Sequence, residues 1–408
     1  MKKYKWFTVL IFISLALTLK IFTLSSPLDS QAKIAKETTT TFSVISQTQN
    51  KDNQKSTSTT LRSLAKEQGI SIGTAVQAKP LREDETYQEV LAREFNLVTP
   101  ENAMKFGRLH PKRDRYDFTN PSTIVNFAQA NQMQVYGHTL VWHNNLPDWL
   151  KEKEWSRQEL IDILREHIYT VVGRFRGQIV VWDVVNEAIE NNGSLRKTIW
   201  LQGIGPEYIE MAFRWENNGS LRKTIWLQGI GPEYIEMAFR WAHEADPQAK
   251  LFYNDYKAEG LGKKSNAIYA LVKDLQQQGV PIHGVGFQMH TSIKRPPNPK
   301  KVAANIQRLG ELGLEVRITE MDVQIYSGKG TREEKLAAQA EVYRDIMSVC
   351  LDAPNCKSFA TWGLSDNYSW IPYFFDRPDS PLLFDESYRP KPAYDALVEE
   401  LQPAFITN

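Results

Sequence analysis

The stretch VVWDVVNE, residues 180–187, decides the fold class that the sequence predicts. It is a run of β-branched and aromatic residues that ends in a carboxylate, and similar runs recur along the chain. The runs begin at Ile72 (IGTAV), Phe95 (FNLVTPEN), Val135 (VYGHTLVW), Val180, Leu251 (LFYNDY), Val285 (VGFQMH), Val316 (VRITEMDV) and Phe359 (FATWGLSD). Stretches with apolar residues at three- and four-residue spacing lie between them and predict helices, for example 158–175, 263–278, 299–312 and 332–351. Eight strands that alternate with helices predict an α/β fold, a single (β/α)8 TIM barrel over residues 61–405.

Polar residues gather at one end of these predicted strands. Residues of this kind lie at or just after the C-terminal strand end, namely Glu101, His138, Glu187, Asp255, His290, Glu320 and Trp362. In a (β/α)8 barrel this end carries the active site. A single residue of this kind would be explained as a solvated loop side chain. Because such residues recur at most of the predicted strand ends, the pattern predicts a functional site.

Glu187 and Glu320 are the candidate catalytic pair. Breaking a glycosidic bond requires a proton for the leaving oxygen and an anion near the developing positive carbon, and two carboxyl groups can supply both. The chain has 11 Trp and 16 Tyr, whose flat rings suit sugar faces. Its 49 basic and 48 acidic residues leave a net charge of +1, which argues against nucleic acid or an anionic surface as partner.

The motifs WDVVNEAI, VRITEMDV, LVTPENAMKF, YGHTLVWHNNLPDW, LFYNDY, GVGFQMH and TWGLSDNYSW together resemble the endo-β-1,4-xylanases of glycoside hydrolase family ten, from about Leu61 to Leu401. The resemblance implies a retaining endo-1,4-β-xylanase that cleaves internal bonds of xylan by double displacement. It implies Glu187 as general acid/base, Glu320 as nucleophile, and xylan or xylo-oligosaccharide as substrate, without a cofactor. Glu187 must then hold a proton near neutral pH, which burial or a neighbouring carboxylate would favour, while Glu320 must be ionised.

The resemblance also implies roles around this pair. His290 would orient Glu320, with Asp322 behind it, and Asn186 would bind the 2-hydroxyl of the sugar at the cleavage point. Side chains that would bind sugar hydroxyls or stack on sugar rings are Glu101, Asn102, Lys105, His138, Trp142, Asn145, Tyr256, Gln288, Trp362 and Trp370. The family more often has Gln at the position of Asn145, and the shorter amide would reach less far.

Three other interpretations are weighed against this one. His138, His143 and His290 could bind a metal, but HTLVWH has no recognised ligand spacing, so we predict no metal. The chain could hydrolyse another β-1,4-glycan, which turnover on different soluble polysaccharides would distinguish. It could also bind xylan without cleaving it, although the presence of both carboxylates argues against this.

The segment ENNGSLRKTIWLQGIGPEYIEMAFRW occurs twice without change, at 190–215 and 216–241. Solenoids need several stacking units, whereas this is one perfect tandem duplication. Only the second copy continues into AHEADP, which completes a helix. We therefore predict that Pro232–Ala245 packs on the barrel and that most of 190–215 is an extra excursion beside the active-site end; the opposite assignment is the alternative.

The N-terminus predicts export. Lys2, Lys3 and Lys5 precede an apolar run over residues 6–19, so residues 1–32 are interpreted as a signal peptide or a membrane anchor. Residues 33–60 are rich in Ser, Thr and Gln and predict a disordered linker. The protein is expected to be monomeric and secreted or periplasmic, with a membrane contact only through an uncleaved N-terminus. In that setting Cys350 and Cys356 are expected to form a disulfide, with two free thiols as the alternative.

Overall fold

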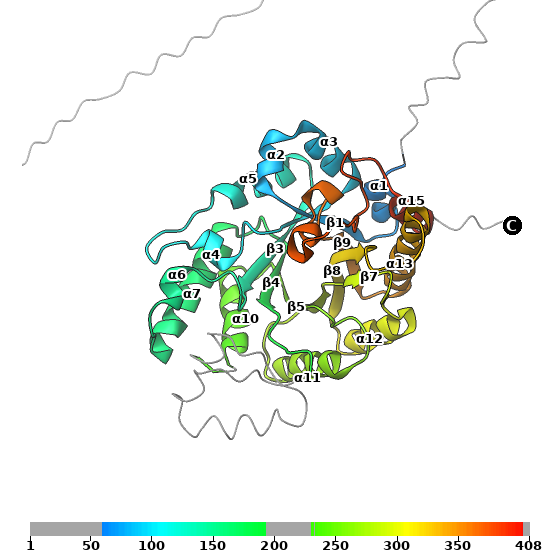
Figure 1. Cartoon of the computed structure of the whole chain (residues 1–408). Helices are drawn as coiled ribbons and strands as arrows, with labels where there is room; N and C mark the ends of the chain where they lie inside the picture. Colours follow the sequence, from blue (N-terminus) through cyan, green and yellow to red (C-terminus); the bar gives the residue numbers. More distant parts are fainter. Residues whose placement is uncertain (1–58, 193–229, 232, 403–408) are drawn as a thin grey trace, which may run out of the picture. The chain divides into compact units, whose positions relative to one another are not determined.

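A closed ring of parallel strands forms the centre of the domain, with helices around its outside (Figure 1). The computed structural model describes residues 59–192, 230–231 and 233–402. The strands are β1 (Ser71–Val76), β2 (Leu97–Pro100), β3 (Gln134–Val141), β4 (Val181–Asn186), β5 (Lys250–Asp255), β6 (Gly284–Phe287), β7 (His290–Ser292), β8 (Glu315–Gln324) and β9 (Cys356–Thr361). Their order is β6-β5-β4-β3-β2-β1-β9-β8-β7, and an additional β6–β8 pairing closes the ring. The predicted (β/α)8 barrel is confirmed.

The strands of the ring are buried on both faces, as expected for parallel strands covered by helices. β2, β4 and β6 are buried over their whole length. Most apolar side chains join one large core cluster, whereas Leu97, Tyr136, Val181 and Phe252 form a second cluster from the neighbouring strands β2 to β5. In a barrel of this size, side chains from the strands fill the inside. The second cluster, which is separate from the large outer core, is this filling.

The helices follow the predicted pattern. They are α1 (Leu61–Glu67), α2 (Ala78–Glu83), α3 (Glu85–Glu94), α4 (Phe106–Leu109), α5 (Thr119–Ala130), α6 (Asp148–Lys151), α7 (Arg157–Arg174), α10 (Tyr234–Ala245), α11 (Lys263–Gln277), α12 (Pro299–Glu311), α13 (Arg332–Asp352), α14 (Trp370–Phe375) and α15 (Pro392–Leu401), with a 3-10 turn η2 (Asp366–Tyr368). Local sequence sets several starts: Ser156 with Glu159 and Thr331 with Glu334 form capping boxes at α7 and α13.

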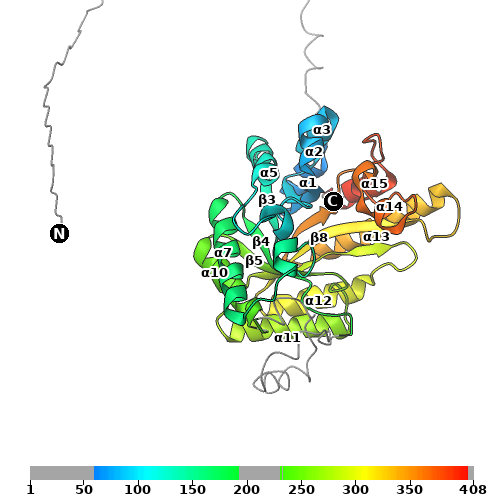
Figure 2. The same ribbon diagram turned by 60° about the vertical axis from the view of Figure 1, so that its left-hand side comes forward.

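The second copy of the repeat supplies the helix between β4 and β5. α10 packs against α7 and β4, and α7 and α10 lie side by side in both views (Figures 1 and 2). Nε of Arg157, at the start of α7, donates to the main-chain oxygen of Ile230 at 2.8 Å, which ties this copy to its neighbour. The prediction that the second copy packs on the barrel is thus confirmed for Tyr234–Ala245, while residues 193–215 of the predicted excursion lie outside the described residues.

Two boundaries differ from the sequence prediction. The run VGFQMH is not one strand, because Met289 adopts a left-handed backbone conformation (φ 66°). His290 begins a separate strand, β7, which pairs with the C-terminal part of β8. The predicted linker reaches residue 60, but Thr60 is the N-cap of α1, where its side chain accepts from the backbone N–H of Ser63.

Cys350 and Cys356 form the predicted disulfide, with their Cα atoms 5.3 Å apart. It joins the last turn of α13 to the start of β9, at the end of the barrel opposite the candidate site. Among the described residues, every helix is too short or too polar to cross a membrane. The predicted signal or anchor, residues 1–32, lies outside the described part.

The packing on the outer face of the ring, between the strands and the helices, predicts a stability effect at Gly137. A Cβ atom there would lie 2.2 Å from Cε3 of Trp182, a fully buried indole. Gly137→Ala should therefore lower the free energy of unfolding by about 1–3 kcal/mol, measured by chemical denaturation. Gly173→Ala is the matched control, because a Cβ in that part of α7 has no neighbour within 4 Å, and this change should be neutral or slightly stabilising. Equal effects of the two changes would contradict this account of the packing around Trp182.

Candidate active site

One candidate carboxylate follows the C-terminal end of β4, and the other lies in the second half of β8. Glu187 directly follows β4 with a left-handed backbone (φ 57°), and its N–H donates to the main-chain oxygen of Asn254 at 2.9 Å. Glu320 lies within β8. The two residues are 9% and 4% exposed, so both carboxyl groups are held largely away from water. Such groups need hydrogen-bond donors around them.

Side-chain amides connect the two carboxylates. Nδ2 of Asn254 donates to Oε1 of Glu320 at 2.7 Å, and Nε2 of Gln288 donates to Oε1 of Glu187 at 3.1 Å. The amide of Asn186 lies between them, with a terminal atom 3.0 Å from Nδ2 of Asn254 and 3.2 Å from Nε2 of Gln288. The orientation of this amide that satisfies its other neighbours directs its oxygen to the indole N–H of Trp142, at 3.3 Å. A continuous amide cluster from β4, β5 and β6 thus fixes one carboxylate relative to the other.

His290 bridges Glu320 and Asp322. Its Nε2 lies 3.2 Å from Oε2 of Glu320 and its Nδ1 lies 2.7 Å from Oδ2 of Asp322, which also accepts from Nε1 of Trp370 at 2.9 Å. Burial lowers the pKa of His290, but the carboxylates of Asp322 and Glu320 outweigh burial and raise this pKa to about 10. The ring is therefore protonated at neutral pH and donates to both carboxylates. This geometry agrees with the predicted role of His290 in orienting Glu320.

His138, on β3, is in the opposite charge state. Burial lowers its pKa to about 4, so the ring is neutral at neutral pH. Its Nδ1 lies 2.8 Å from Oδ2 of Asp183, and the hydroxyl of Tyr136 donates to Oδ1 of Asp183 at 2.7 Å.

Ligand atoms of His138, Asp183 and Glu320 lie within 4.8 Å of one another, a grouping that could hold a metal ion. Hydrogen bonds account for the placement of each member, and His143 and His290, from the alternative metal interpretation, are not in this group.

Glu101, Asn102 and Lys105 follow β2 and form one wall of the site. Glu101 accepts from Nε2 of Gln77 at 2.8 Å and from Nδ2 of Asn102 at 3.0 Å, while Nζ of Lys105 donates to Oδ1 of Asn102 at 2.9 Å. Burial raises the pKa of Glu101 and lowers the pKa of Lys105, although the negative charges of Glu320, Glu101 and Glu187 act against the lowering at Lys105. The negative charges of all three carboxylates therefore act on the ammonium group of Lys105.

Aromatic rings cover the site histidines and Lys105. Trp362 lies 5.1 Å from the ring of His138 and Trp370 lies 5.3 Å from that of His290, measured between ring centroids. Nζ of Lys105 is 5.0 Å from the Trp142 ring centroid and 5.9 Å from that of Trp362. The three tryptophans named by the resemblance are thus brought together with the polar groups.

Tyr256 and Asn145 lie further out. Tyr256 follows β5 at the rim, with Nζ of Lys264 3.5 Å from its ring centroid. Asn145 is exposed in a left-handed conformation (φ 55°), and its main-chain oxygen accepts from the N–H of Gly107 at 2.7 Å. Asparagine is one of the few residues with a side chain that tolerates this backbone conformation. The turn alone therefore accounts for an asparagine at this position.

Three residues of the site were missed by the sequence prediction. Asn254 holds Glu320, Asp183 holds His138, and Gln77 holds Glu101. Asp183 and Asn254 carry a usable signal, because each is a polar residue inside a buried strand that ends in a predicted site residue. Gln77 follows β1, whose end carried no candidate in the prediction.

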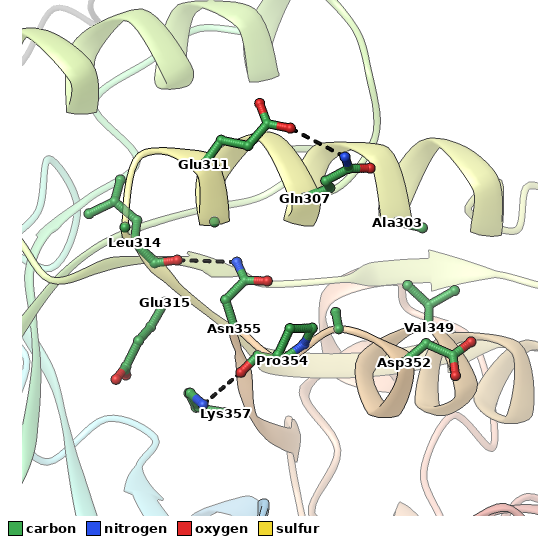
Figure 3. A pocket seen from close by; sticks show the side chains of 13 residues that line it. Ala303, Gln307, Glu311, Leu314, Glu315, Val349, Asp352, Pro354, Asn355 and Lys357 are labelled. Carbon is green, nitrogen blue, oxygen red and sulfur yellow. Dashed lines mark hydrogen bonds between the residues drawn. The ribbon is translucent and has the colours of Figure 1, made fainter.

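A separate pocket at the other end of the barrel is lined by polar groups that bond to one another (Figure 3). It has a volume of about 760 Å³ between α12, the end of α13 and the starts of β8 and β9. Nε2 of Gln307 donates to Glu311, Nδ2 of Asn355 to the oxygen of Leu314, and Nζ of Lys357 to the oxygen of Pro354. The Asn355 contact joins the segment before β9 to the residue before β8, and the other two contacts are local, so the lining indicates a structural role.

Comparison with known families agrees with the geometry of the site. The model of glycosyl hydrolase family 10 matches residues 60–218 and 214–400. The chain belongs to glycosyl hydrolase family 10. The two family-10 matches meet where the first copy of the repeat gives way to the second, as a duplication inside one domain would produce.

Similar family-10 proteins cover most of the chain. Endo-1,4-beta-xylanase B of Thermotoga neapolitana is 45% identical over 344 residues, which cover 84% of this chain and 91% of that protein. The crystal structure of xylanase 10B from Thermotoga petrophila, in complex with xylobiose, is 44% identical, with a TM-score of 0.75 over 84% of this chain and 97% of that one. The intracellular xylanase TsXylA of Thermoanaerobacterium saccharolyticum is 38% identical, with a TM-score of 0.71 over 82% of this chain and 97% of that one.

The environment of His290 predicts an unusual titration. Because two carboxylates hold its proton, the NMR signals of the His290 ring should show a protonated imidazole at pH 8, with a transition near pH 10. Asp322→Asn should lower this pKa by at least about one unit, since a neutral amide cannot stabilise the imidazolium as a carboxylate does. His138 is the control within the same molecule and should be neutral down to about pH 4. A His290 transition near 6.5 in the unaltered protein would contradict this charge assignment.

Proposed function

We propose that this chain hydrolyses internal β-1,4-xylosidic bonds of xylan with retention, with Glu187 as general acid/base and Glu320 as nucleophile. The observation that carries the proposal is the pair of buried carboxylates on β4 and β8, joined through the amide cluster of Asn186, Asn254 and Gln288. The two groups have different surroundings, because Glu320 accepts from the protonated His290 and from Asn254, whereas Glu187 accepts from the neutral amide of Gln288. Carboxylates with unequal surroundings suit unequal roles.

The reaction proceeds in two displacements. Glu187 donates its proton to the glycosidic oxygen as an oxygen of Glu320 attacks the anomeric carbon, which releases the leaving chain and forms a covalent glycosyl ester. Glu187, now ionised, removes a proton from a water molecule that attacks the same carbon, and the ester bond to Glu320 breaks. The cation of His290 stabilises the anion of Glu320 before attack and after release.

The remaining site residues hold the sugar. Glu101, Asn102 and Lys105 present charged and amide groups that can bind sugar hydroxyls, and Trp142, Trp362 and Trp370 present rings that can stack on sugar faces. Xylose lacks the hydroxymethyl group of glucose, and the rings of Trp362 and Trp370 lie against His138 and His290, where they would obstruct that group. This position supports a preference for xylan over β-1,4-glucans.

Removal of each carboxylate should have a different effect. Glu320→Ala should abolish turnover of every xyloside, because the covalent step loses its nucleophile. Glu187→Ala should lower kcat on xylan by about 100- to 10,000-fold, but the first step should be nearly unaffected with an aryl xyloside whose leaving group needs no proton. These rates would be measured by release of reducing sugar and by a burst of the aryl leaving group.

Glu315→Gln is the matched control for these two changes. It alters a glutamate of the same strand as Glu320 at the opposite end of the barrel, where Glu315 pairs with Lys250, and it should keep full activity. The proposed roles would be wrong if Glu320→Ala were active, or if Glu187→Ala lost the aryl and polymeric substrates to the same degree.

We also propose that the N-terminal segment directs export of the chain. The protein is released if this segment is cleaved and is held at the membrane if it is not. Two observations support this: the basic and apolar pattern of residues 1–32, and the disulfide between Cys350 and Cys356, which forms most readily in an oxidising compartment. Membership in the family does not decide the location, because the relative TsXylA is intracellular.

Fractionation of cells that express the full chain would test export. The protein should be found outside the cytoplasm with Cys350 and Cys356 oxidised, as measured by thiol labelling before and after reduction. A chain without residues 1–32 should stay in the cytoplasm with reduced thiols. Export would be refuted if both chains were found in the cytoplasm.

A further inference from the structure

The last residues of β5 point to the two faces of the barrel wall in turn. The side chain of Asn254 lies on the site face, where it donates to Glu320, and its main-chain oxygen accepts from the N–H of Glu187. Tyr253 and Asp255 alternate with it along the strand, so their side chains lie on the outer face, where Tyr253 joins the large core cluster. The sequence presents Asp255 as a polar strand-end residue, yet the proposed reaction gives it no step.

A buried ion pair fixes the carboxylate of Asp255. Its Oδ1 lies 2.6 Å from Nζ of Lys264, at the start of α11, and accepts from the N–H of Tyr256 at 2.9 Å. The side chains of Asp255 and Lys264 are 0% and 4% exposed, so neither charge reaches water. Separating two such charges is costly, because each would be left in the protein interior away from its partner. The carboxylate therefore has a fixed position from which it can orient other groups.

The second carboxylate oxygen of Asp255 orients the phenol of Tyr253. The hydroxyl of Tyr253 donates to Oδ2 of Asp255 at 2.7 Å, and its oxygen accepts from the backbone N–H of Ile189 at 3.1 Å. Because the hydroxyl hydrogen is directed to the carboxylate, the lone pairs of the oxygen are available to the N–H group. Tyr253 and Ile189 are both buried, and a buried backbone N–H needs an acceptor.

These contacts fix the backbone that follows the acid/base. Ile189 comes two residues after Glu187 and directly before the first copy of the repeat, 190–215. The segment is bonded to β5 at both of its ends, from the N–H of Glu187 to the main-chain oxygen of Asn254 and from the N–H of Ile189 to the phenol of Tyr253. Both acceptors belong to β5, so the segment is held by residues outside the repeat.

We propose that Tyr253, oriented by Asp255, is a positioning residue that keeps the carboxyl group of Glu187 directed at the glycosidic oxygen. The proposal deepens the proposed function, on which it rests. Glu187 has a left-handed backbone (φ 57°), a conformation that a residue with a side chain keeps only with support from its surroundings, and the bond two residues later supplies support. The nucleophile is held by other groups, Asn254 and His290, so loss of the phenol hydroxyl affects the acid/base selectively.

Tyr253→Phe tests this role, because it removes the hydroxyl and keeps the ring. On a xylo-oligosaccharide, kcat should fall about tenfold with KM changed less than about twofold, because a displaced acid protonates the leaving sugar poorly. With an aryl xyloside whose leaving group needs no proton, the rate constant of the burst should change less than about twofold, since attack by Glu320 is unaltered. The burst amplitude counts active sites, so loss of folded protein is measured separately from loss of rate.

Tyr394→Phe is the matched control. The hydroxyl of Tyr394, on α15, donates to the buried carboxylate of Glu94 at 2.9 Å, just before β2 and at the other end of the barrel. This change also removes a hydrogen bond from a phenol to a carboxylate, and it should alter neither rate. The proposal would be overturned if Tyr253→Phe lost both substrates to the same degree, or kept full activity on the xylo-oligosaccharide.

Hydrogen exchange at the amide of Ile189 separates this proposal from the proposed function. Exchange there should be at least about tenfold faster in Tyr253→Phe, because the N–H loses its acceptor, and unchanged in Tyr394→Phe. If the unaltered enzyme hydrolyses neither substrate, the proposed function fails. Faster exchange would then still support the hold of Tyr253 on the segment after Glu187, and unchanged exchange would refute it.

Discussion

A carboxylate withdrawn from water must be surrounded by donors or positive charge, and the polar groups around Glu320 follow from that requirement. Glu320 is 4% exposed, and Asn254 on β5 and His290 on β7 each supply a hydrogen bond to it. His290 in turn needs the carboxylate of Asp322 to hold its proton. One buried anion on β8 therefore organises side chains from β5, β7 and β8, and only a closed ring of strands brings these together.

The same requirement separates two histidines that the sequence presents alike. Both follow or end predicted strands, and both lie within 3 Å of an aspartate. His290 faces two carboxylates and is cationic, whereas His138 is more deeply buried, has the positive charges of Lys105 and His290 nearby, and is neutral. A cation beside the nucleophile stabilises charge, while a neutral ring can both donate and accept hydrogen bonds with sugar hydroxyls.

The sequence predicted the ring of strands and most of the site because its signals are local. The alternation of strands and helices, and the polar residues at most strand ends, can be found in windows of ten residues. The bonds from Asn254 to Glu320 and from Gln77 to Glu101 join residues 66 and 24 positions apart, and only the closure of the ring shows which amides meet which carboxylates. The break after Phe287 also had no local signal, since Met289 is not a residue that favours a left-handed conformation.

The barrel tolerates a change in chain length at some loops and not at others. The break between β6 and β7 and the repeat after β4 are examples of the two cases. β7 pairs with β8 so that His290 lies opposite Asp322, and loss of one residue at Gln288 or Met289 would bring Thr291 to that position and turn the imidazole to the other face. By contrast, 26 extra residues begin three positions after Glu187, whose backbone is already fixed by Asn254. Insertions and deletions in this lineage are thus expected to accumulate behind Glu187, whereas the segment of two residues before His290 admits no change in number.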